Sequence, residues 1–493
     1  MAPTNPCSHL LVTVFSLLTI ISISTSLPTT QSDDPLLKIL HTSLTQLSTT
    51  ISTATHIHRR INEQKQQAEL EDCLQLLDLS RDRVLSSVRA ITKSAHTDAR
   101  TWLSAVLTNY DTCLDGLNGY VKLSMESQLK SLMKSTSVSL ALLATSDDDD
   151  DVITQVVEFP SWISKHDRKL LEARTPKDVK ANVVVAKDGS GKFKTVQEAL
   201  NSVPDNGNTR YVIYVKKGVY KETVRLEKNK KNVMIVGDGM DATVITGSLN
   251  FVDGTTTFNS ATLAAVGDGL ILQDLKIENT AGAIKHQAVA LRVGADRSVI
   301  NRCNIEGYQD TLYTHSLRQF YRDSVISGTV DFIFGDAAVV FQNCKLVARR
   351  PLDNQQNLVT AQGRIDPNQN TGTSIQNCQI VPSNDLKLAK GAIKSYLGRP
   401  WKEYSRTVFM QSYIDSHIDP KGWLEWDGQF ALKTLFYGEY MNKGPGAGTG
   451  GRVNWPGYHV ITDANVAKSY TVAGLIQGGT WLKDTGVAFT EGL

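Results

Sequence analysis

The stretch NRCNI, residues 301–305, is one copy of a five-residue pattern that recurs along the C-terminal part of this chain and ends each time in Ile or Leu. The final residues of successive copies are separated by steps of 28, 21, 20, 34 and 34 residues. The copies, in chain order, are QDLKI (273–277), NRCNI (301–305), RDSVI (322–326), QNCKL (342–346), QNCQI (376–380) and MQSYI (410–414). One strand-like segment therefore returns at irregular intervals.

This repeat decides between three architectures. A β-sandwich would show turn signals about every 8–12 residues, and a parallel α/β fold would need helical patterns between its strands. From about residue 180 onward the chain has neither signal and is dominated by Gly, Val, Ile, Asn and Thr. A single strand that recurs at long, irregular steps describes a solenoid whose coils differ in their loops. The sequence predicts a mainly-β domain at residues 172–493, a right-handed parallel β-helix.

The N-terminal third is different, with almost no Gly or Pro between residues 31 and 145. Residues 70–91, LEDCLQLLDLSRDRVLSSVRAI, space their apolar side chains as the stripe of an amphipathic helix. We therefore expect an all-α helical bundle over residues 27–145. Cys73 and Cys113 are the cysteines of this region, and they are predicted to tie two helices together.

The first 26 residues indicate entry into the secretory route. The apolar stretch LLVTVFSLLTIISIS (10–24) is short, and the small residues Ser24 and Ser26 stand where a signal peptidase would cut. Because no Lys or Arg precedes it, a signal anchor is the alternative. No other stretch reaches about 18 consecutive apolar residues, so nothing else is expected to span a membrane.

Residues 146–171 read as a linker between the two domains. Its start, SDDDDDV (146–152), holds five aspartates that repel one another, and a calcium site would need spaced ligands that it lacks. Its end, RKLL (168–171), places Arg168 and Lys169 between a helical and a β-rich part of a secreted chain. We expect proteolytic processing at Arg168-Lys169-Leu170-Leu171.

Two aspartates lie at matching positions of neighbouring repeats. Asp310 follows Ile305 by five residues, and Asp331 follows Ile326 by five. If the coils stack in register, the two carboxylates lie side by side, because stacked strands are about 4.8 Å apart. Two carboxylates at that spacing do not both ionise easily, so one is expected to stay protonated while a cation keeps the other charged. That pair supplies an acid and a nucleophile or base at a single pH.

Six segments carry a resemblance to a known family. They resemble the conserved blocks of plant pectin methylesterases (pectinesterases) and, at the N-terminal end, the inhibitor-like pro-region found in such proteins; RKLL resembles their processing motif. The resemblance covers residues 180–493 almost completely and implies the same parallel β-helix. The segments are AKDGSGKFKTVQEAL (186–200), QAVALRV (287–293), GYQDTLY (307–313), GTVDFIFG (328–335), YLGRPW (396–401) and, in the pro-region, TWLSAVLTNYDTCLDG (101–116).

The resemblance implies demethylation of cell-wall pectin, with methanol as the second product. Asp331 would be the nucleophile that forms an acyl-enzyme, and Asp310 the acid that protonates methanol and then the base that activates water. Gln287 and Gln309 would donate hydrogen bonds to the oxyanion, and Arg399 would pair with Asp331, keep its pKa low and help bind the substrate.

Aromatic residues are expected to bind the sugar chain. Trp401 is the first candidate, and Tyr313 and Trp423 are further ones. Neither a metal nor a cofactor is expected, because no His/Cys/acid cluster has the spacing of a metal site and ester hydrolysis of this kind needs none.

Three cysteines fall in the predicted β-helix. Cys344 and Cys378 occupy the same position of their repeats, and if their coils are neighbours their Cα atoms are close enough for a disulfide. Cys303 occupies that position too and is expected to be a buried thiol. The inhibitor-like region lacks the first of the two cysteine pairs that are common in its family, which leaves open whether it restrains the enzyme.

The partners follow from these inferences. Residues 1–170 hold 15 Lys+Arg and 19 Asp+Glu, a net of −4, whereas the rest holds 37 and 31, a net of +6, which suits an anionic polymer. Pectin, a processing protease and a proteinaceous pectinesterase inhibitor are expected partners of a monomer secreted to the cell wall, and nucleic acid is not. A pectate lyase or polygalacturonase, or an inhibitor-like binding protein, are the alternatives.

Overall fold

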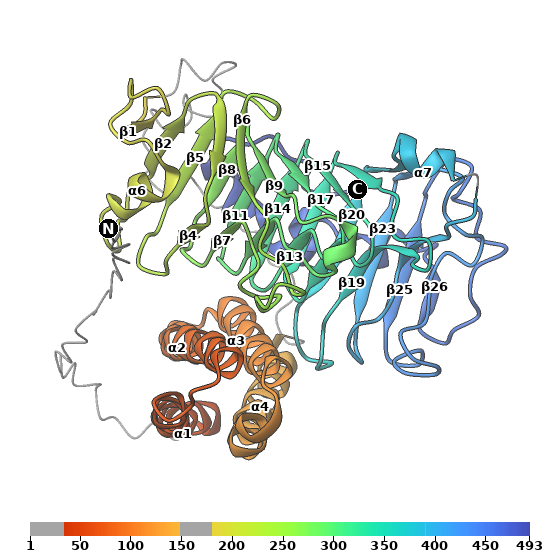
Figure 1. Cartoon of the computed structure of the whole chain (residues 1–493). Coiled ribbons are helices and arrows are strands. Elements are labelled where there is room, and N and C mark those ends of the chain that lie inside the picture. Colours follow the sequence, from red (N-terminus) through yellow and green to blue (C-terminus); the bar gives the residue numbers. More distant parts are fainter. Residues whose placement is uncertain (1–33, 148–179, 390) are drawn as a thin grey trace, which may run out of the picture.

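The protein has two domains, an N-terminal bundle of helices and a long β-helix that lies above it in Figure 1. The computed structural model describes residues 34–147, 180–389 and 391–493. The predicted signal peptide at 1–26 and the RKLL segment at 168–171 lie outside the described residues. Within the described ranges, no helix is long and apolar enough to cross a membrane.

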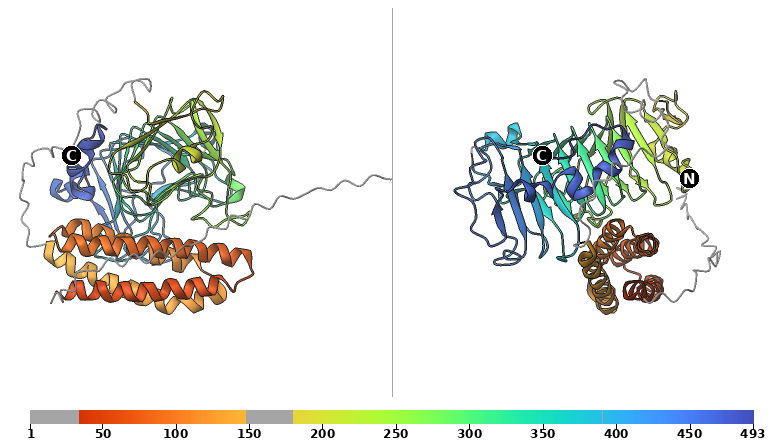
Figure 2. Two further views of the ribbon diagram at one scale, coloured as in Figure 1. Left: turned by 90° about the vertical axis from the view of Figure 1, so that its left-hand side faces the viewer. Right: turned by 180° about the vertical axis from the view of Figure 1, so that it is seen from behind.

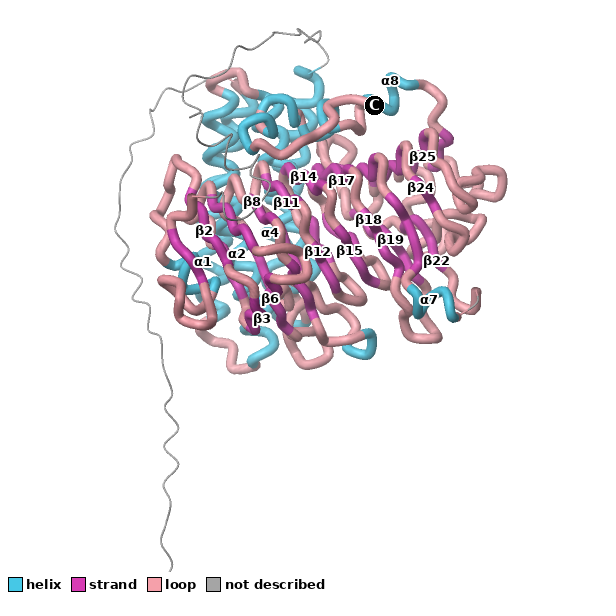
Figure 3. The backbone as a smooth tube through the Cα atoms, turned by 90° about the horizontal axis from the view of Figure 1, so that it is seen from above, coloured by secondary structure: helices cyan, strands magenta, loops and turns pink. Residues whose placement is uncertain are grey.

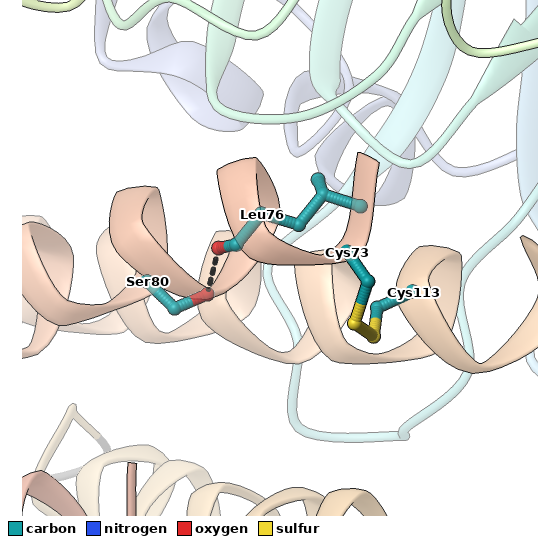
Figure 4. The surroundings of a disulfide bond; sticks show 4 residues. All are labelled: Cys73, Leu76, Ser80 and Cys113. Atoms are coloured by element: carbon teal, nitrogen blue, oxygen red, sulfur yellow. Dashed lines mark hydrogen bonds between the residues drawn. A yellow bond between two sulfur atoms is a disulfide. The ribbon is translucent and has the colours of Figure 1, made fainter. Parts of the chain in front are cut away.

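The bundle confirms the predicted all-α region. Asp34 caps its first helix by accepting a hydrogen bond from the backbone N–H of Leu36 at 2.8 Å. Cys73 and Cys113 form the predicted disulfide between the second and third helices, with Cα atoms 4.5 Å apart (Figure 4). The four helices are α1 (Pro35–His58), α2 (Gln64–Ile91), α3 (His96–Gly116) and α4 (Gly119–Asp147).

The β-helix consists of three parallel sheets, and successive strands pass from sheet A to B to C, so that each circuit makes one coil (Figures 2 and 3). Among the described residues sheet A has eleven strands, β1 (Val183–Val185), β2 (Tyr211–Val215), β5 (Val233–Gly237), β8 (Ile271–Gln273), β11 (Ser298–Asn301), β14 (Arg318–Arg322), β17 (Ala338–Gln342), β20 (Gly372–Gln376), β23 (Arg406–Met410), β25 (Phe436–Tyr440) and β26 (Tyr458–Val460). Sheet B has eight, β3 (Gly218–Lys221), β6 (Thr243–Gly247), β9 (Lys276–Asn279), β12 (Asn304–Glu306), β15 (Val325–Gly328), β18 (Lys345–Ala348), β21 (Gln379–Pro382) and β24 (Tyr413–Ile414). Sheet C has seven, β4 (Val224–Leu226), β7 (Leu263–Ala265), β10 (Leu291–Val293), β13 (Leu312–Thr314), β16 (Ile333–Gly335), β19 (Asn357–Gln362) and β22 (Ser395–Gly398).

The five-residue repeat is the corner between sheets A and B. The second residue of every copy takes the left-handed conformation, with φ between 47° and 58°, which turns the chain; these residues are Asp274, Arg302, Asp323, Asn343, Asn377 and Gln411. The last residue of every copy points into the tube and is fully buried. Ile305 pairs with Ile326, and Leu346 with Ile380, so the repeat predicted both the coil and its register.

Short helices cover one end of the tube and the outer face of one of its sheets. The helix α6 (Val196–Asn201) begins with a capping box between Thr195 and Glu198 and packs its apolar residues into the core at the end of the tube. A C-terminal segment with α8 (Ala464–Lys468), α9 (Val472–Ile476) and the 3₁₀ helices η3 (Gly478–Thr480) and η4 (Leu482–Thr485) covers the outer face of sheet A. Two further short helices, η2 (Ala283–Lys285) and α7 (Asn384–Leu388), lie in loops.

The predicted disulfide between Cys344 and Cys378 is wrong. Both residues, and Cys303, are buried free thiols. In-register coils place equivalent Cβ atoms nearly parallel and about 4.8 Å apart, which is wider than the roughly 3.8 Å that a disulfide needs. Instead, the backbone N–H of Cys344 donates a hydrogen bond to Sγ of Cys378 at 3.3 Å.

We expect a thiol titration of the denatured, unreduced β-helix domain to find three free thiols, and the same number after reduction. The physical reason is the fixed strand spacing, which keeps the Cys344 and Cys378 sulfur atoms as separate core groups. A count of one before reduction and three after it would show that the bridge exists.

Candidate active site

The two aspartates lie side by side, as the repeat predicts. Asp310 precedes β13 by two residues and Asp331 precedes β16 by two, and Leu312 pairs with Ile333 in the sheet. The backbone N–H of Asp310 donates to the carbonyl of Val330 at 3.0 Å, which joins the two turns directly. Both aspartates are left-handed, with φ of 61° and 51°, a conformation that Asp tolerates better than most residues. Their residues are only 7% and 5% exposed.

An arginine from a later coil holds one of the two carboxylates. Arg399 directly follows β22, which lies two strands beyond β16 in sheet C. Its Nε donates to Asp331 Oδ1 at 2.9 Å and its Nη2 to Oδ2 at 2.6 Å, a bidentate pair. The predicted pairing is confirmed, and it fixes the orientation of the Asp331 carboxylate.

Burial and charge separate the two carboxyl groups in pKa. Burial is the largest influence on Asp310, and together with the neighbouring Asp331 charge it raises the pKa well above the usual value. Burial also raises the pKa of Asp331, but the hydrogen bond and charge of Arg399 oppose that rise. The expectation that Arg399 keeps the pKa of Asp331 low is therefore wrong in direction, because burial outweighs the ion pair. Asp310 is still the group that keeps its proton longer.

The two glutamines lie at the same edge of the pair. Gln309 is adjacent to Asp310, and its backbone carbonyl accepts a hydrogen bond from Ala288, the neighbour of Gln287, at 3.2 Å. Oε1 of Gln309 is buried and has no hydrogen-bond partner among the described residues. The backbone contact thus places Gln287 and Gln309 on adjacent coils beside the pair, and the side-chain oxygen of Gln309 has no described partner.

Aromatic rings form a floor beside the aspartates. The Tyr313 ring stacks on Phe334 with centroids 4.1 Å apart, and Trp401 meets Phe334 edge-on at 6.0 Å. Gly363 lies under Trp401; a Cβ there would come within 2.8 Å of the indole, so the absence of a side chain lets the ring lie against the sheet. The structure therefore brings Trp401 and Tyr313 to the site.

Trp423 does not belong to the site, contrary to the prediction. It is fully buried, stacks on Tyr437 at 4.1 Å and donates its Nε1–H to Glu439 at 3.3 Å, so it is a core residue. The tryptophan that faces the site is Trp426, which is 37% exposed and lies under the guanidinium of Arg399 at 4.2 Å. The acidic neighbours Glu425 and Asp427 could have distinguished Trp426 from Trp423, because charged residues are typical of an exposed segment.

The helical bundle covers the aromatic floor. Tyr313, Phe334 and Trp401 belong to the same apolar cluster as the buried leucines of the helices, and Figure 1 shows the bundle lying along the side of the β-helix that carries β4, β7, β13 and β19. Lys402 forms ion pairs with Asp111 at 2.9 Å and with Asp115 at 2.5 Å, both on α3.

Polar contacts fix the bundle at further points. Arg83 of α2 pairs bidentately with Asp268 at 2.8 and 2.5 Å. Trp102 of α3 donates to Asp296 at 3.1 Å, and Arg318 bridges Asp296 to Asp98 of α3. These contacts are partly or fully buried. They therefore fix the orientation of the bundle relative to the β-helix as well as hold the two domains together.

These features define a protein of the parallel β-helix class whose outer wall carries a buried pair of carboxyl groups. Among the described residues, no group of three or more His, Cys, Asp or Glu residues could hold a metal ion.

Comparison with known proteins identifies the family. Residues 182–479 match the pectinesterase family, and residues 19–142 match the plant invertase/pectin methylesterase inhibitor family. Pectinesterase 2.1 of Solanum lycopersicum is 58% identical over 96% of this chain and 87% of its own length, and pectinesterase/pectinesterase inhibitor 18 of Arabidopsis thaliana is 56% identical over 92% and 84%. The chain therefore belongs to the pectinesterase family, carries an inhibitor-family domain before its catalytic domain, and is an ester hydrolase.

Solved structures agree with this assignment. The pectin methylesterase from carrot superposes with a TM-score of 0.63 at 58% identity, covering 64% of this chain and 99% of its own. The enzyme from Aspergillus niger gives a TM-score of 0.53 at 29% identity, covering 61% and 95%. The carrot structure corresponds in extent to the β-helix alone, so a folded domain of this kind can exist without a bundle.

Replacing one member of the carboxylate pair should stabilise the fold. Because the pKa of Asp310 is raised in the folded chain, its stabilising contribution is present below about pH 4 and is lost as pH rises through the folded-state pKa. Asp310→Asn should therefore melt at a higher temperature than the parent at about pH 8, and the difference should vanish near about pH 4.

Asp296→Asn provides the contrast. Coulombic attraction to Arg318 holds the pKa of Asp296 below its usual value despite burial, so its contribution is present above the unfolded-state pKa and is lost in acid. That variant should melt at a lower temperature than the parent at about pH 8. If Asp310→Asn lowered the melting temperature at that pH, the raised pKa of Asp310 would be contradicted.

Proposed function

We propose that this chain hydrolyses the methyl esters of galacturonate units in pectin, giving a free carboxylate and methanol. The observation that carries the proposal is the asymmetric pair, Asp331 held by Arg399 beside an Asp310 whose pKa is raised further. Arg399 orients one carboxylate for attack, and the other, whose pKa is raised further, is placed to give up a proton.

The first half of the reaction forms an acyl-enzyme. An oxygen of the Asp331 carboxylate attacks the ester carbonyl carbon, and the negative charge of the tetrahedral intermediate moves to the carbonyl oxygen. The side-chain amides of Gln287 and Gln309 donate hydrogen bonds to that oxygen, and one such donor contributes about 3 kcal/mol. When the intermediate collapses, the C–O bond to the methoxy group breaks and Asp310 transfers its proton to the departing oxygen, releasing methanol.

The second half restores the enzyme. Asp310, now ionised, takes a proton from a water molecule as that water attacks the acyl carbon of the anhydride with Asp331. The bond between the acyl carbon and the Asp331 oxygen breaks, so the galacturonate acid is released, Asp331 is again a carboxylate, and Asp310 again carries a proton. Arg399 binds Asp331 with two hydrogen bonds in both resting states, which keeps its oxygens aimed.

Other activities are less well supported. A pectate lyase would use clustered acids to bind calcium, and the described residues contain no group of three or more potential metal ligands. A polygalacturonase would break glycosidic bonds, so that the polymer would shorten. A purely inhibitory protein would have no use for the raised pKa of Asp310 or for the oriented Asp331.

We expect residues 172–493 to release methanol from highly methylated pectin without lowering its viscosity. Asp331→Asn should abolish release because the nucleophile is lost, and Asp310→Asn should reduce it by about 10²–10⁴-fold because an amide cannot deliver a proton. Methanol is measured enzymatically, and folding is checked by melting temperature. No methanol from a well-folded parent would refute the proposal, and falling viscosity would favour a depolymerase.

We also propose that the helical domain is a pro-region that restrains the enzyme until it is removed. The support is its position over Tyr313, Phe334 and Trp401, the rings on which a sugar chain would stack. The same proposal includes secretion to the cell wall, removal of the bundle after the 168–171 segment, action as a monomer and recognition by a separate proteinaceous inhibitor.

The full chain should show about a tenth or less of the activity of residues 172–493, which corresponds to about 1.4 kcal/mol or more of bundle docking. Asp115→Lys places two cations together at Lys402, its partner at 2.5 Å, and should raise the activity of the full chain severalfold. Glu126→Lys makes the same charge reversal within the bundle, at a residue whose ion pair is with Lys130 of its own helix, and should change nothing. Equal activity of full chain and domain would refute restraint.

A further inference from the structure

Arg292 lies on the floor of the active site, one coil away from Asp310. It is the central residue of β10, where its neighbours Leu291 and Val293 point into the core, so its own side chain points outward. In sheet C it pairs with Tyr313, which in turn pairs with Phe334. Strand spacing places its Cα about 4.8 Å from that of Tyr313 and about 10 Å from that of Phe334.

The guanidinium of Arg292 is buried without an acidic partner. The residue is 1% exposed, and its Nε and Nη1 make no hydrogen bond with any described residue. Its Cζ lies over the ring of Phe258, 3.4 Å from the ring centroid. Burial, followed by the charge of Arg225, lowers its pKa to about 9. A buried cation in this state is unfavourable, because two donor groups have left water and gained nothing.

Two other arginines of the β-helix, the buried Arg318 and the partly buried Arg225, have hydrogen-bond partners. Arg318 is as deeply buried, but it donates three hydrogen bonds to Asp296 and one to Asp98. Arg225, which lies on the same outward row of sheet C as Arg292, donates to the carbonyls of Val224, Ala261 and Asn259 and so holds a loop. Arg292 differs from both, because its Nε and Nη1 groups donate no hydrogen bond to a described residue that would explain their position.

The bundle is what encloses Arg292 in the intact chain. Phe258, Ala264 and Tyr313, which surround it, belong to the apolar cluster formed with the helices. Asp72 of α2 accepts hydrogen bonds from Thr256 and Asn259 of the loop that carries Phe258, and its negative charge acts on Arg292 without forming an ion pair. Removing the bundle would therefore remove both this cover and the negative charge of Asp72 that acts on Arg292.

We propose that Arg292 is a carboxylate-binding residue of the cleft, which in the separated β-helix domain binds the free carboxylate of a galacturonate unit next to the one being hydrolysed. This inference rests on the proposed function. A guanidinium binds a carboxylate with two charge-assisted hydrogen bonds, whereas a methyl ester offers neither charge nor a second equivalent oxygen. Arg292 thus makes the enzyme prefer a methylated unit whose neighbour has already lost its methyl group.

The test is binding of a fully demethylated oligogalacturonate to residues 172–493, measured by calorimetry at fixed ionic strength. The domain is usable alone because the carrot enzyme, 58% identical, corresponds to the β-helix alone. Arg292→Gln should weaken binding about tenfold, the loss expected for a charge-assisted hydrogen bond in a site that excludes water. Arg302→Gln removes the same charge at the corner between sheets A and B, where Arg302 pairs with Asp274, and should weaken binding less than about twofold.

Equal affinity of the Arg292→Gln and Arg302→Gln variants would overturn the proposal. If Arg292→Gln does not fold, Arg292→Lys keeps the charge but loses the planar fork, and severalfold weaker binding is expected; unchanged binding overturns the proposal as well. Methanol release by the parent domain reports separately on the proposed function, since the binding measurement involves no ester.

Discussion

The in-register stacking of parallel coils is the constraint on which the rest of this structure depends. Because each coil repeats the last at the strand spacing, a residue type that suits one coil suits the next. Ile305 pairs with Ile326, and the left-handed corners at Arg302 and Asp323 lie one above the other. The same rule acts on polar residues. It places Asp310 beside Asp331 at a spacing that an unconstrained chain would avoid, and the buried core of the tube supplies the stability that holds them there.

The unfavourable burial and close spacing of the two carboxyl groups separate their pKa values. Two enclosed carboxyl groups of ordinary pKa would both be charged at neutral pH, whereas burial and mutual repulsion keep Asp310 protonated longer than Asp331. The asymmetry comes from Arg399, which reaches Asp331 from two coils farther along the tube. One solenoid thus gives two similar residues different environments, because Arg399 donates two hydrogen bonds to Asp331 and acts on Asp310 through its charge.

The sequence was sufficient where the repeat itself carried the information. The five-residue pattern predicted the tube, the register and the aspartate pair, and helical periodicity predicted the bundle. The presence of two cysteines in the helical region predicted the Cys73–Cys113 disulfide. The sequence was insufficient where the outcome depended on about 1 Å of side-chain separation or on which face a loop presents. Cys344 and Cys378 occupy equivalent positions, but in-register Cβ atoms are too far apart for a bond. Similarly, Trp423 and Trp426 are three residues apart, and only the path of the loop decides which one meets Arg399.

Under the proposed removal of the bundle, the outer face of sheet C binds two partners in turn, first the helices and then the substrate. Its row of Arg292, Tyr313 and Phe334 is apolar enough to bind the helices, and the helices cover it in the precursor. A surface adapted only to the bundle would give a buried arginine an acidic partner from the helices, as Arg318 receives one from Asp98. Arg292 receives none, although Asp72 is near. The unpaired guanidinium therefore weakens docking of the bundle. An arginine at this position is best explained if its hydrogen-bond partner is a ligand that binds after the bundle has been removed.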